Sequence, residues 1–294
     1  MFAHALQDCS PATLDSYTRA VCDFLNFAER EFYAVSVAEI DDYVAHLHSS
    51  GRARASVRAA IGGIRAFFRR LHGYGLCPVN PALVVKAPKA TQSESVSSIV
   101  MRSLSFAEVD RALAYLKEAG NLRNLTLFYF LSRLGLRASE ACALRWRALA
   151  KRKGQWVVSI RGKGRKTRTV LLPEEGVEYM LGYRKERFQL EPDADMSEPY
   201  LDQPLFGHRY DPRRPIKRHA LNAWLTSLYR RAGLRKLSPH DLRHTCFTHL
   251  CELRVPLEEI QAVAGHESIG TTSLYIKAGR VMSGGTAAFN RISR

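Results

Sequence analysis

Strand-like sequence is confined to one short segment of this chain, and this restricts the fold more than any other feature. In residues 155–173 (QWVVSIRGKGRKTRTVLLP), the runs VVSI and TVLL flank a glycine-containing turn, as a β-hairpin requires. Apolar residues elsewhere recur mainly at helical spacing. The chain is therefore predicted to be mainly α-helical, with a small β-hairpin or sheet, in two domains.

Three helices are predicted in the N-terminal part. Ser10 and Pro11 suit the N-cap and the first position of a helix. Ser36 and Glu39 have the spacing of a capping box ahead of the second helix. A third helix is predicted over residues 56–71, with its arginines mostly off the apolar stripe. The residues of that buried stripe are Val57, Ile61, Ile64, Phe67 and Phe68.

Domain boundaries follow from a change in composition. A segment rich in glycine and proline closes the helical part, and the polar, serine-rich stretch TQSESVSSIVMRS follows it. Ser105 and Glu108 then form another capping-box pattern. We expect an N-terminal helical domain over residues 1–90, a linker over 91–103, and a larger domain with a C-terminal tail over 104–294.

Composition excludes several classes of protein. No run of about 18 apolar residues is present, so a membrane span is not expected. The start MFAHALQDCS lacks the basic and apolar regions of a signal peptide. The 6 cysteines form no CxxC pair, which favours cytosolic thiols over a disulfide framework.

Basic residues gather in three runs. The formal net charge is +16, and no acidic residue lies between Asp42 and Glu94 or within 151–168. A third run, 209–236, contains only Asp211 as an acidic residue. One such run is usually a solvated face, but three favour a nucleic-acid partner. The candidate DNA-binding residues are Arg52, Arg54, Arg58, Arg65, Arg69, Arg161, Arg165, Lys166 and Arg168.

Tyr275 is the candidate nucleophile. It lies in AGHESIGTTSLYIK, nine residues after His266, and most single tyrosines are packing residues instead. A phenol has a reference pKa near 10, so about one molecule in a thousand is ionised at neutral pH. Attack on phosphorus therefore requires a base or strong electrostatic help.

Two arginines are candidates to hold a phosphate. A guanidinium offers a planar fork that fits phosphate oxygens and stays charged, which suits Arg137 and Arg243. An ion pair between Arg137 and Glu140 is an equally good interpretation, and both can hold, since a carboxylate can orient a guanidinium. His240 and Arg243 are one helical turn apart, and Ser238 with Pro239 begins their helix. The first turn of a helix favours an anion.

Lys163 is placed at the tip of the predicted hairpin, between Gly162 and Gly164. Glycines let such a tip approach DNA closely, and an ammonium there can protonate a departing 5′ oxygen. A solvated lysine that binds backbone phosphate without specificity is the alternative.

A zinc site is the main rival for the histidine-rich segment. His240 and His244 have the i, i+4 spacing of helical zinc ligands, and further histidine and cysteine follow. One helix cannot turn all of them to one side, and Cys246 and Cys251 fit its buried stripe better. No metal ligand set is therefore assigned.

In combination, these segments resemble the tyrosine recombinase (phage integrase) family, and most closely its compact, Xer-like members. The shared pattern is GLRxxE, a hairpin GKG, HxxR, GH and a final tyrosine, in this order. The resemblance implies a helical core-binding domain followed by a mixed α/β catalytic domain. It assigns phosphate clamping to Arg137 and Arg243, general acid catalysis to Lys163, proton transfer to His240, a second histidine to His266 and the nucleophile to Tyr275.

The resemblance also implies the reaction and the assembly. Tyr275 would attack a DNA phosphate and form a 3′-phosphotyrosyl link, with neither metal nor ATP nor another cofactor. The partners would be double-stranded DNA and three further copies in a homo-tetramer on paired sites, with or without a second recombinase, in the cytoplasm at the nucleoid and not at a membrane. The residues after Tyr275 depart from the Xer-like continuation, which favours a mobile-element recombinase.

Three other functions remain open from the sequence. A type IB topoisomerase shares this chemistry, although the two-domain layout and the length favour recombination. A noncatalytic DNA-binding protein would not need Tyr275 together with Lys163. A metal-dependent nuclease or transposase would need clustered carboxylates, which the basic segments lack.

Overall fold

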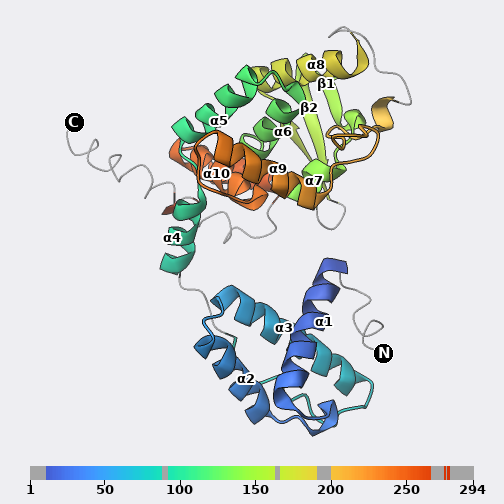
Figure 1. Cartoon of the computed structure of the whole chain (residues 1–294), viewed down its shortest axis with the longest axis vertical. Coiled ribbons are helices and arrows are strands. Elements are labelled where there is room, and N and C mark those ends of the chain that lie inside the picture. Colours follow the sequence, from blue (N-terminus) through green and yellow to red (C-terminus); the bar gives the residue numbers. More distant parts are fainter. Residues whose placement is uncertain are drawn as a thin grey trace, which may run out of the picture. The chain divides into compact units, whose positions relative to one another are not determined.

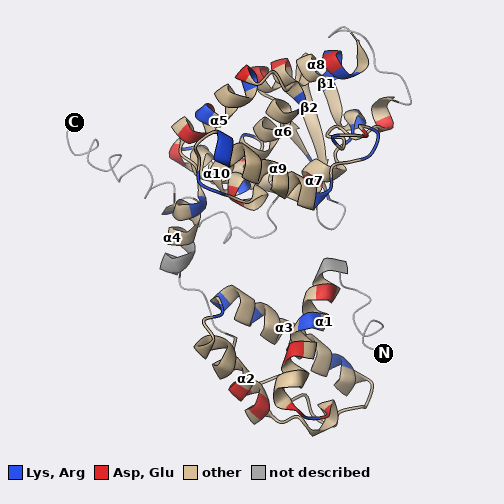
Figure 2. Cartoon of the chain, in the orientation of Figure 1, with Lys and Arg blue, Asp and Glu red and all other residues tan. Residues whose placement is uncertain are grey.

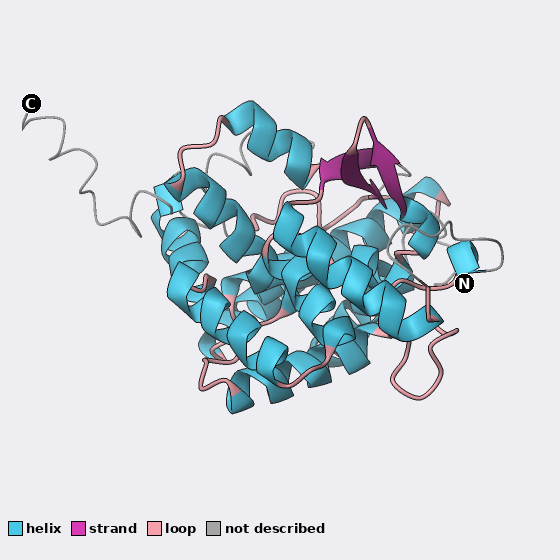
Figure 3. Cartoon of the chain, turned by 90° about the horizontal axis from the view of Figure 1, so that it is seen from above, coloured by secondary structure: helices cyan, strands magenta, loops and turns pink. Residues whose placement is uncertain are grey.

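The chain forms two units. The computed structural model describes residues 11–87, 92–162, 166–190 and 200–265, together with residues 275, 277 and 278. Contacts within the chain divide it into Met1–Thr91 and Gln92–Arg294 (Figure 1). The predicted fold class is confirmed: the described residues are mainly helical, beside one small sheet (Figure 3).

The first unit contains the three predicted helices, α1 (Pro11–Ala28), α2 (Val37–Ser49) and α3 (Arg54–Gly73), with a short 3-10 turn at Phe32–Ala34. Helix α1 begins at Pro11, as predicted; Ser10 lies outside the described residues. The predicted apolar stripe of α3 is buried throughout.

Local hydrogen bonds fix the start of α2. The Ser36 hydroxyl accepts from the backbone N–H of Ala38, and the Glu39 carboxylate accepts from the backbone N–H of Ser36 at 3.0 Å. Side chains thus accept from two backbone N–H groups that have no partner within the helix, and the capping box predicted from the sequence is confirmed.

Aromatic side chains join the three helices of the first unit. Phe24 of α1 packs edge-to-face against Tyr43 of α2, with ring centroids 5.3 Å apart, and against Phe68 of α3 at 6.4 Å. These rings prefer such edge contacts because the edge of one ring is positive and the face of the other is negative. Helix α2 carries acidic residues and neither lysine nor arginine, α3 carries arginines and no acidic residue, and α1 carries both signs (Figure 2).

The second unit is built around a buried helix. Its helices are α4 (Gln92–Arg102), α5 (Phe106–Glu118), α6 (Leu122–Ser132), α7 (Ala138–Ala143), α8 (Glu174–Phe188), α9 (Arg218–Arg231), α10 (Pro239–Glu252) and α11 (Leu257–Ala264), with 3-10 turns at Trp146–Ala148 and Tyr200–Asp202. Helix α6 is buried from Leu125 to Ser132 and packs against α5, α8 and α10. A helix that is apolar on all sides needs such cover.

The sheet has three antiparallel strands in the order β1–β2–β3. Strands β2 (Gln155–Arg161) and β3 (Thr167–Leu171) pair with Val158 opposite Val170, which confirms the predicted hairpin. Its tip, residues 163–165, lies outside the described residues. Strand β1 (Leu149–Arg152) was not predicted, because only four residues form it and two of them are exposed.

The serine-rich stretch expected as a linker contains helix α4. Ile99 is buried in a cluster with Cys246 and Phe247 of α10, and Val96 and Val100 pack against the same cluster. Serine and glutamate made the segment resemble a linker, but its apolar residues lie at helical spacing. Their burial against α10 explains why the segment belongs to the second unit.

At Gly135, alanine would be unfavourable for two reasons, the backbone conformation and a steric clash. Its φ is +63°, and an added Cβ would lie 2.8 Å from the Phe247 ring and 3.2 Å from Cys246 Sγ. Gly233 has a similar φ of +64° with nothing within 4 Å of an added Cβ. We expect Gly135→Ala to lower the free energy of unfolding by about 1–3 kcal/mol more than Gly233→Ala does. Equal losses in urea denaturation would show that the Phe247 contact contributes nothing.

Candidate active site

The candidate site lies where α7, β3, α10 and the end of α11 meet in the second unit. Arg137 is the N-cap of α7, and His240 and Arg243 lie on α10. Ser238 caps α10 with Asp241, since its hydroxyl accepts from the backbone N–H of Asp241 and the Asp241 carboxylate accepts from the backbone N–H of Ser238 at 2.8 Å. The predicted start of this helix is therefore confirmed.

Arg137 is held by the residue expected to pair with it. Its Nη1 donates to Glu140 Oε1 at 2.7 Å, and its backbone N–H donates to Glu140 Oε2 at 2.9 Å. Its Nη2 lies 3.5 Å from the carbonyl oxygen of Gly265. About a third of the Arg137 side chain is exposed (31%), whereas Glu140 is buried. The carboxylate therefore orients a guanidinium that still reaches solvent.

Arg168 completes the pairing of the buried carboxylate. Its Nη1 and Nη2 each donate to one Glu140 oxygen at 2.8 Å, and its Nε donates to the Val263 carbonyl oxygen at 2.7 Å. Burial alone would raise the pKa of Glu140, but hydrogen bonds from Arg168 and Arg137 and their charges lower it to about 2. The expected contact of Arg168 with DNA is corrected: its donors face inward and the side chain is 11% exposed.

Arg243 is a buried cation. It is 1% exposed, and its two terminal nitrogens donate to the carbonyl oxygens of Gly135 at 2.6 Å and Ala264 at 2.5 Å. Its guanidinium lies 4.6 Å from the centroid of the Phe247 ring. Desolvation and the charge of Arg137 lower its pKa to about 10, so it keeps its charge at neutral pH. These contacts hold a positive charge in the interior, beside the last turn of α11.

Tyr275 packs against α10, the helix that carries Arg243. Its hydroxyl is 2.7 Å from His244 Nδ1, and its ring packs edge-on against Phe247 at 5.6 Å. The side chain is 2% exposed, and burial raises the phenol pKa to about 12, while the positive charges of Arg243 and Arg137 act in the opposite direction. Tyr275 is therefore a neutral phenol in this state.

His240 lies at the surface in the first turn of α10. Its ring is 4.3 Å from the His244 ring, in an edge-to-face contact. Desolvation by its neighbours and the positive charges of Arg243 and Arg137 lower the pKa of His240. A neutral imidazole at neutral pH is suited to accept a proton.

Sequence reasoning considered His244 only as a zinc ligand and missed its contact with Tyr275. Its position directly after Arg243, one helical turn beyond His240, was the available signal. Lys163, His266 and Arg165 lie outside the described residues, as does the tail after Tyr275 apart from residues 277 and 278.

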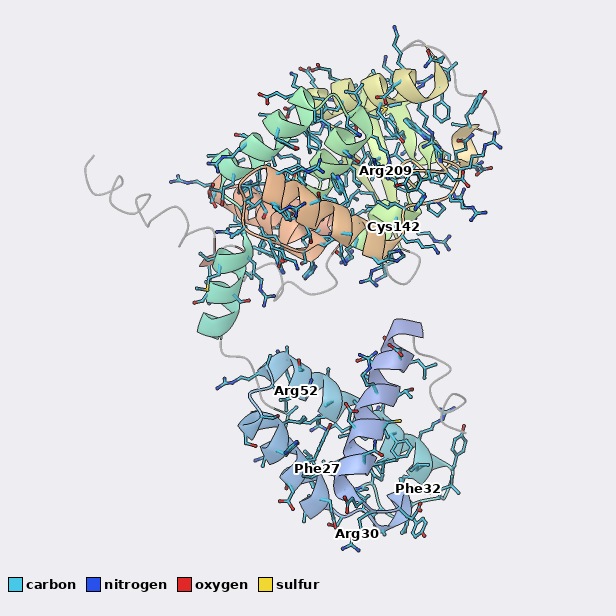
Figure 4. The ribbon with its side chains drawn as sticks, in the orientation of Figure 1. Phe27, Arg30, Phe32, Arg52, Cys142 and Arg209 are labelled. Carbon is cyan, nitrogen blue, oxygen red and sulfur yellow. The ribbon has the colours of Figure 1, made fainter. Side chains whose placement is uncertain are left out.

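The other DNA-binding candidates occupy different environments. In the first unit, Arg52 lies in the turn between α2 and α3 (Figure 4). Arg65 is partly buried and donates to the carbonyl oxygens of Ala82, at 3.4 Å, and Val85, so its guanidinium has partners within the unit. Its contact with DNA stays a prediction. The exposed candidates are Arg52, Arg54, Arg69, Arg161 and Lys166, and Arg58 is half-buried.

The histidine and cysteine side chains of α10 contact different parts of the unit. The Cys246 thiol donates to the Arg133 carbonyl oxygen at 3.2 Å, and His249 Nε2 lies 2.8 Å from the Leu104 carbonyl oxygen. Among the described residues, no group of three or more histidine, cysteine or acidic side chains is placed to hold a metal ion. No helix in this part of the chain is long and apolar enough to cross a membrane.

A helical unit, a mixed unit and a tyrosine grouped with two arginines are typical of enzymes that join DNA strands through tyrosine. The chain belongs to the phage integrase family, whose model matches residues 102–280. The N-terminal SAM-like domain of phage integrases matches residues 3–75. The resemblance seen in the sequence is therefore confirmed.

Curated relatives are similar along nearly the whole chain. Tyrosine recombinase XerC of Xylella fastidiosa (strain M23) is 30% identical over 281 residues, which cover 93% of this chain and 88% of the relative. Tyrosine recombinase XerD of Rhizobium meliloti (strain 1021) is 32% identical over 271 residues, covering 90% and 84%.

Solved structures share the fold. The XerH site-specific recombinase bound to palindromic difH substrate, a post-cleavage complex, matches with a TM-score of 0.76 and 19% identity over 96% of this chain and 81% of that one. A lambda integrase dimer bound to a COC′ core site matches with a TM-score of 0.67 and 16% identity, covering 93% and 74%.

Removal of the Glu140 carboxylate should destabilise the second unit. Glu140→Ala would leave the mostly buried Arg168 without its acid, which typically costs about 3–5 kcal/mol. In the matched control Asp15→Ala, the lost pair with Arg19 is exposed at 71% and 73%, and we expect a loss below about 1 kcal/mol. Chemical denaturation of both variants measures the difference, and equal losses would contradict the buried pairing.

The same carboxylate should make stability depend on pH. Its folded pKa of about 2 lies below the ordinary value of 4.5, so its contribution is full above pH 4.5 and is lost as the pH falls towards 2. Glu140→Gln should flatten this part of the stability profile relative to the native chain, and an unchanged acid limb would contradict the assignment.

Proposed function

We propose that this chain is a site-specific DNA recombinase that cuts and rejoins DNA through a 3′-phosphotyrosyl link at Tyr275. One observation carries the proposal beyond family membership: the Tyr275 phenol packs against Phe247 of α10, the helix that carries Arg243, and the charges of Arg243 and Arg137 both act on it. A nucleophile and two phosphate-binding cations are thus grouped in one unit.

The reaction exchanges one phosphate ester for another. The Tyr275 oxygen attacks the scissile phosphorus, the bond from phosphorus to the 5′ oxygen breaks, and the phenolic proton leaves to a base. The 5′ hydroxyl of a second strand then attacks the phosphotyrosine and releases the phenol. The number of phosphate ester bonds is conserved, so the exchange needs no ATP.

The arginines supply the electrostatic part of catalysis. Charge develops on the non-bridging oxygens in the transition state, and fixed cations there stabilise it without reorganising. Arg137 is oriented by Glu140 and Arg243 by two carbonyl groups, so both are held before DNA arrives. Proton transfer is assigned to Lys163 for the leaving 5′ oxygen and to His240 and His266 for the phenol.

DNA would be held by basic residues of both units. Arg52 in the turn before α3 and Arg54 at the start of α3 are exposed and are placed to meet phosphates. Lys166 beside the hairpin tip is exposed as well. Neutralised phosphates release counterions, so binding should weaken steeply with salt. We further propose that four copies act together on two duplexes, in the cytoplasm at the nucleoid, on sites carried by a mobile element.

Covalent trapping tests this function without knowledge of the site. A pool of nicked duplexes of random sequence is incubated with the protein in EDTA, and denaturation-resistant adducts are recovered and sequenced. We expect one enriched sequence and a 3′-phosphate on Tyr275 by mass spectrometry. An adduct that requires a divalent ion, or lies on another residue, would contradict the mechanism. Relaxation of a supercoiled plasmid without exchange between paired sites would instead assign a topoisomerase.

Tyr275→Phe should bind the recovered duplex and form no adduct, because only the hydroxyl is lost. Tyr229→Phe is the matched control: Tyr229 is equally buried, and its hydroxyl has no hydrogen-bond partner among the described residues. Electrophoresis under denaturing conditions measures the adduct, and gel shift measures binding. An adduct formed by Tyr275→Phe would move the nucleophile to another residue.

Arg137→Ala should slow adduct formation by about a hundredfold or more, as when a preorganised donor is removed from a transition state. Arg147→Ala is the control, because Arg147 pairs with Asp202 at the surface, with side chains 49% and 58% exposed. Single-turnover rates on the recovered duplex measure both variants. Similar rates for the two would remove Arg137 from the catalytic set.

A further inference from the structure

The Tyr275 hydroxyl has a hydrogen-bond partner that the proposed reaction does not use. His244 Nδ1 lies 2.7 Å from this oxygen, and the two rings are 5.4 Å apart. His244 lies on α10, one residue after Arg243 and one turn after His240. The nucleophile is thus hydrogen-bonded to a side chain that neighbours both the group assigned to phosphate binding and the group assigned to proton transfer.

The surroundings of this contact are apolar. Tyr275 lies in a buried cluster with Ile99 of α4, Phe247 of α10 and Ile260 of α11. Because the Tyr275 end of the contact is buried, water competes less for this hydrogen bond than at the surface. A phosphodiester held at the protein surface cannot meet a hydroxyl that belongs to a side chain exposed by only 2%. The phenol has to leave this position before it attacks.

We infer that His244 is a positioning residue: its Nδ1 accepts the hydrogen bond of the Tyr275 hydroxyl and keeps the nucleophile protonated and covered until DNA binds. The role in recombination rests on the proposed function, whereas the contact does not.

The protonation states favour a holding role over a catalytic base. Desolvation and the neighbouring charges lower the pKa of His244 to about 4, and the phenol pKa is about 12. Transfer of the proton from this phenol to this imidazole is therefore strongly disfavoured. The two groups therefore share a neutral hydrogen bond.

A bound phosphate offers the phenol a better acceptor. A non-bridging oxygen held by the partly exposed Arg137, near the positive charge of the buried Arg243, carries negative charge, and hydrogen bonds to charged acceptors are about twice as strong as neutral ones. DNA binding would thus draw the hydroxyl from His244 towards the scissile phosphate. In the absence of DNA the covered phenol cannot react with other substrates.

Acetylation of tyrosine hydroxyls by N-acetylimidazole tests the contact without DNA, with mass spectrometry as the readout. We expect Tyr275 to be protected in the native chain, while Tyr210, 82% exposed, reacts. His244→Phe fills the site but removes the acceptor, and should raise Tyr275 acetylation about three- to tenfold. His244→Asn, whose amide oxygen can take the place of Nδ1, should restore protection.

Three results would overturn the inference: native Tyr275 reacting as fast as Tyr210, no increase in His244→Phe, or no rescue by His244→Asn. Protection of the buried Tyr229 in each variant reports an intact fold. If Tyr229 loses its protection in His244→Phe, that variant is misfolded, and the tautomer of His244 in the native chain tests the inference instead. Nitrogen NMR should show Nδ1 without a proton and Nε2 with one, and the opposite tautomer would contradict the proposal.

Adduct formation on the recovered duplex separates this inference from the proposed function. His244→Phe should form the adduct about three- to tenfold faster in single turnover, because less free energy is needed to release the phenol. An unchanged or slower rate would overturn the holding role. If the native chain forms no adduct with any duplex, the proposed function fails, while acetylation still tests the contact.

Discussion

The buried carboxylate of Glu140 is the contact on which the geometry of the site depends. Its two oxygens receive hydrogen bonds from Arg137 and Arg168. These arginines in turn contact the carbonyl groups of Gly265 and Val263 at the end of α11. Removing a carboxylate from water is costly, and only close, well-directed partners compensate. One acid therefore holds α7, β3 and α11 together.

Charge at the site is unbalanced in a way that fits an anionic substrate. Three guanidiniums, those of Arg137, Arg168 and Arg243, lie near the Glu140 carboxylate, and Tyr275 stays neutral. Arg243 is stabilised by two carbonyl oxygens and by the face of the Phe247 ring. A phosphate diester would supply the missing negative charge, so the fold prepares the cations and leaves the nucleophile neutral until the substrate arrives.

Local patterns predicted local structure well. The capping boxes at Ser36 and Ser105, the stripe of α3 and the β2–β3 hairpin all formed as expected, because each depends on residues close in sequence. Composition was a weaker guide, since the serine-rich stretch contains α4. Arg168 shows a pattern that was available but unused: it lies two residues before the buried Val170 and opposite the buried Ile160, so it shares the inner face of its strand.

The sequence by itself determined the helical class, the single hairpin and the set of reactive residue types, since these follow from periodicity and from motifs in a fixed order. Only the tertiary structure decided which arginine faces inward and which group receives the Tyr275 hydroxyl. Those contacts join residues 28 and 31 positions apart, Arg168 with Glu140 and Tyr275 with His244. Such pairs form only when separate elements pack, and packing depends on the whole core and not on any short pattern.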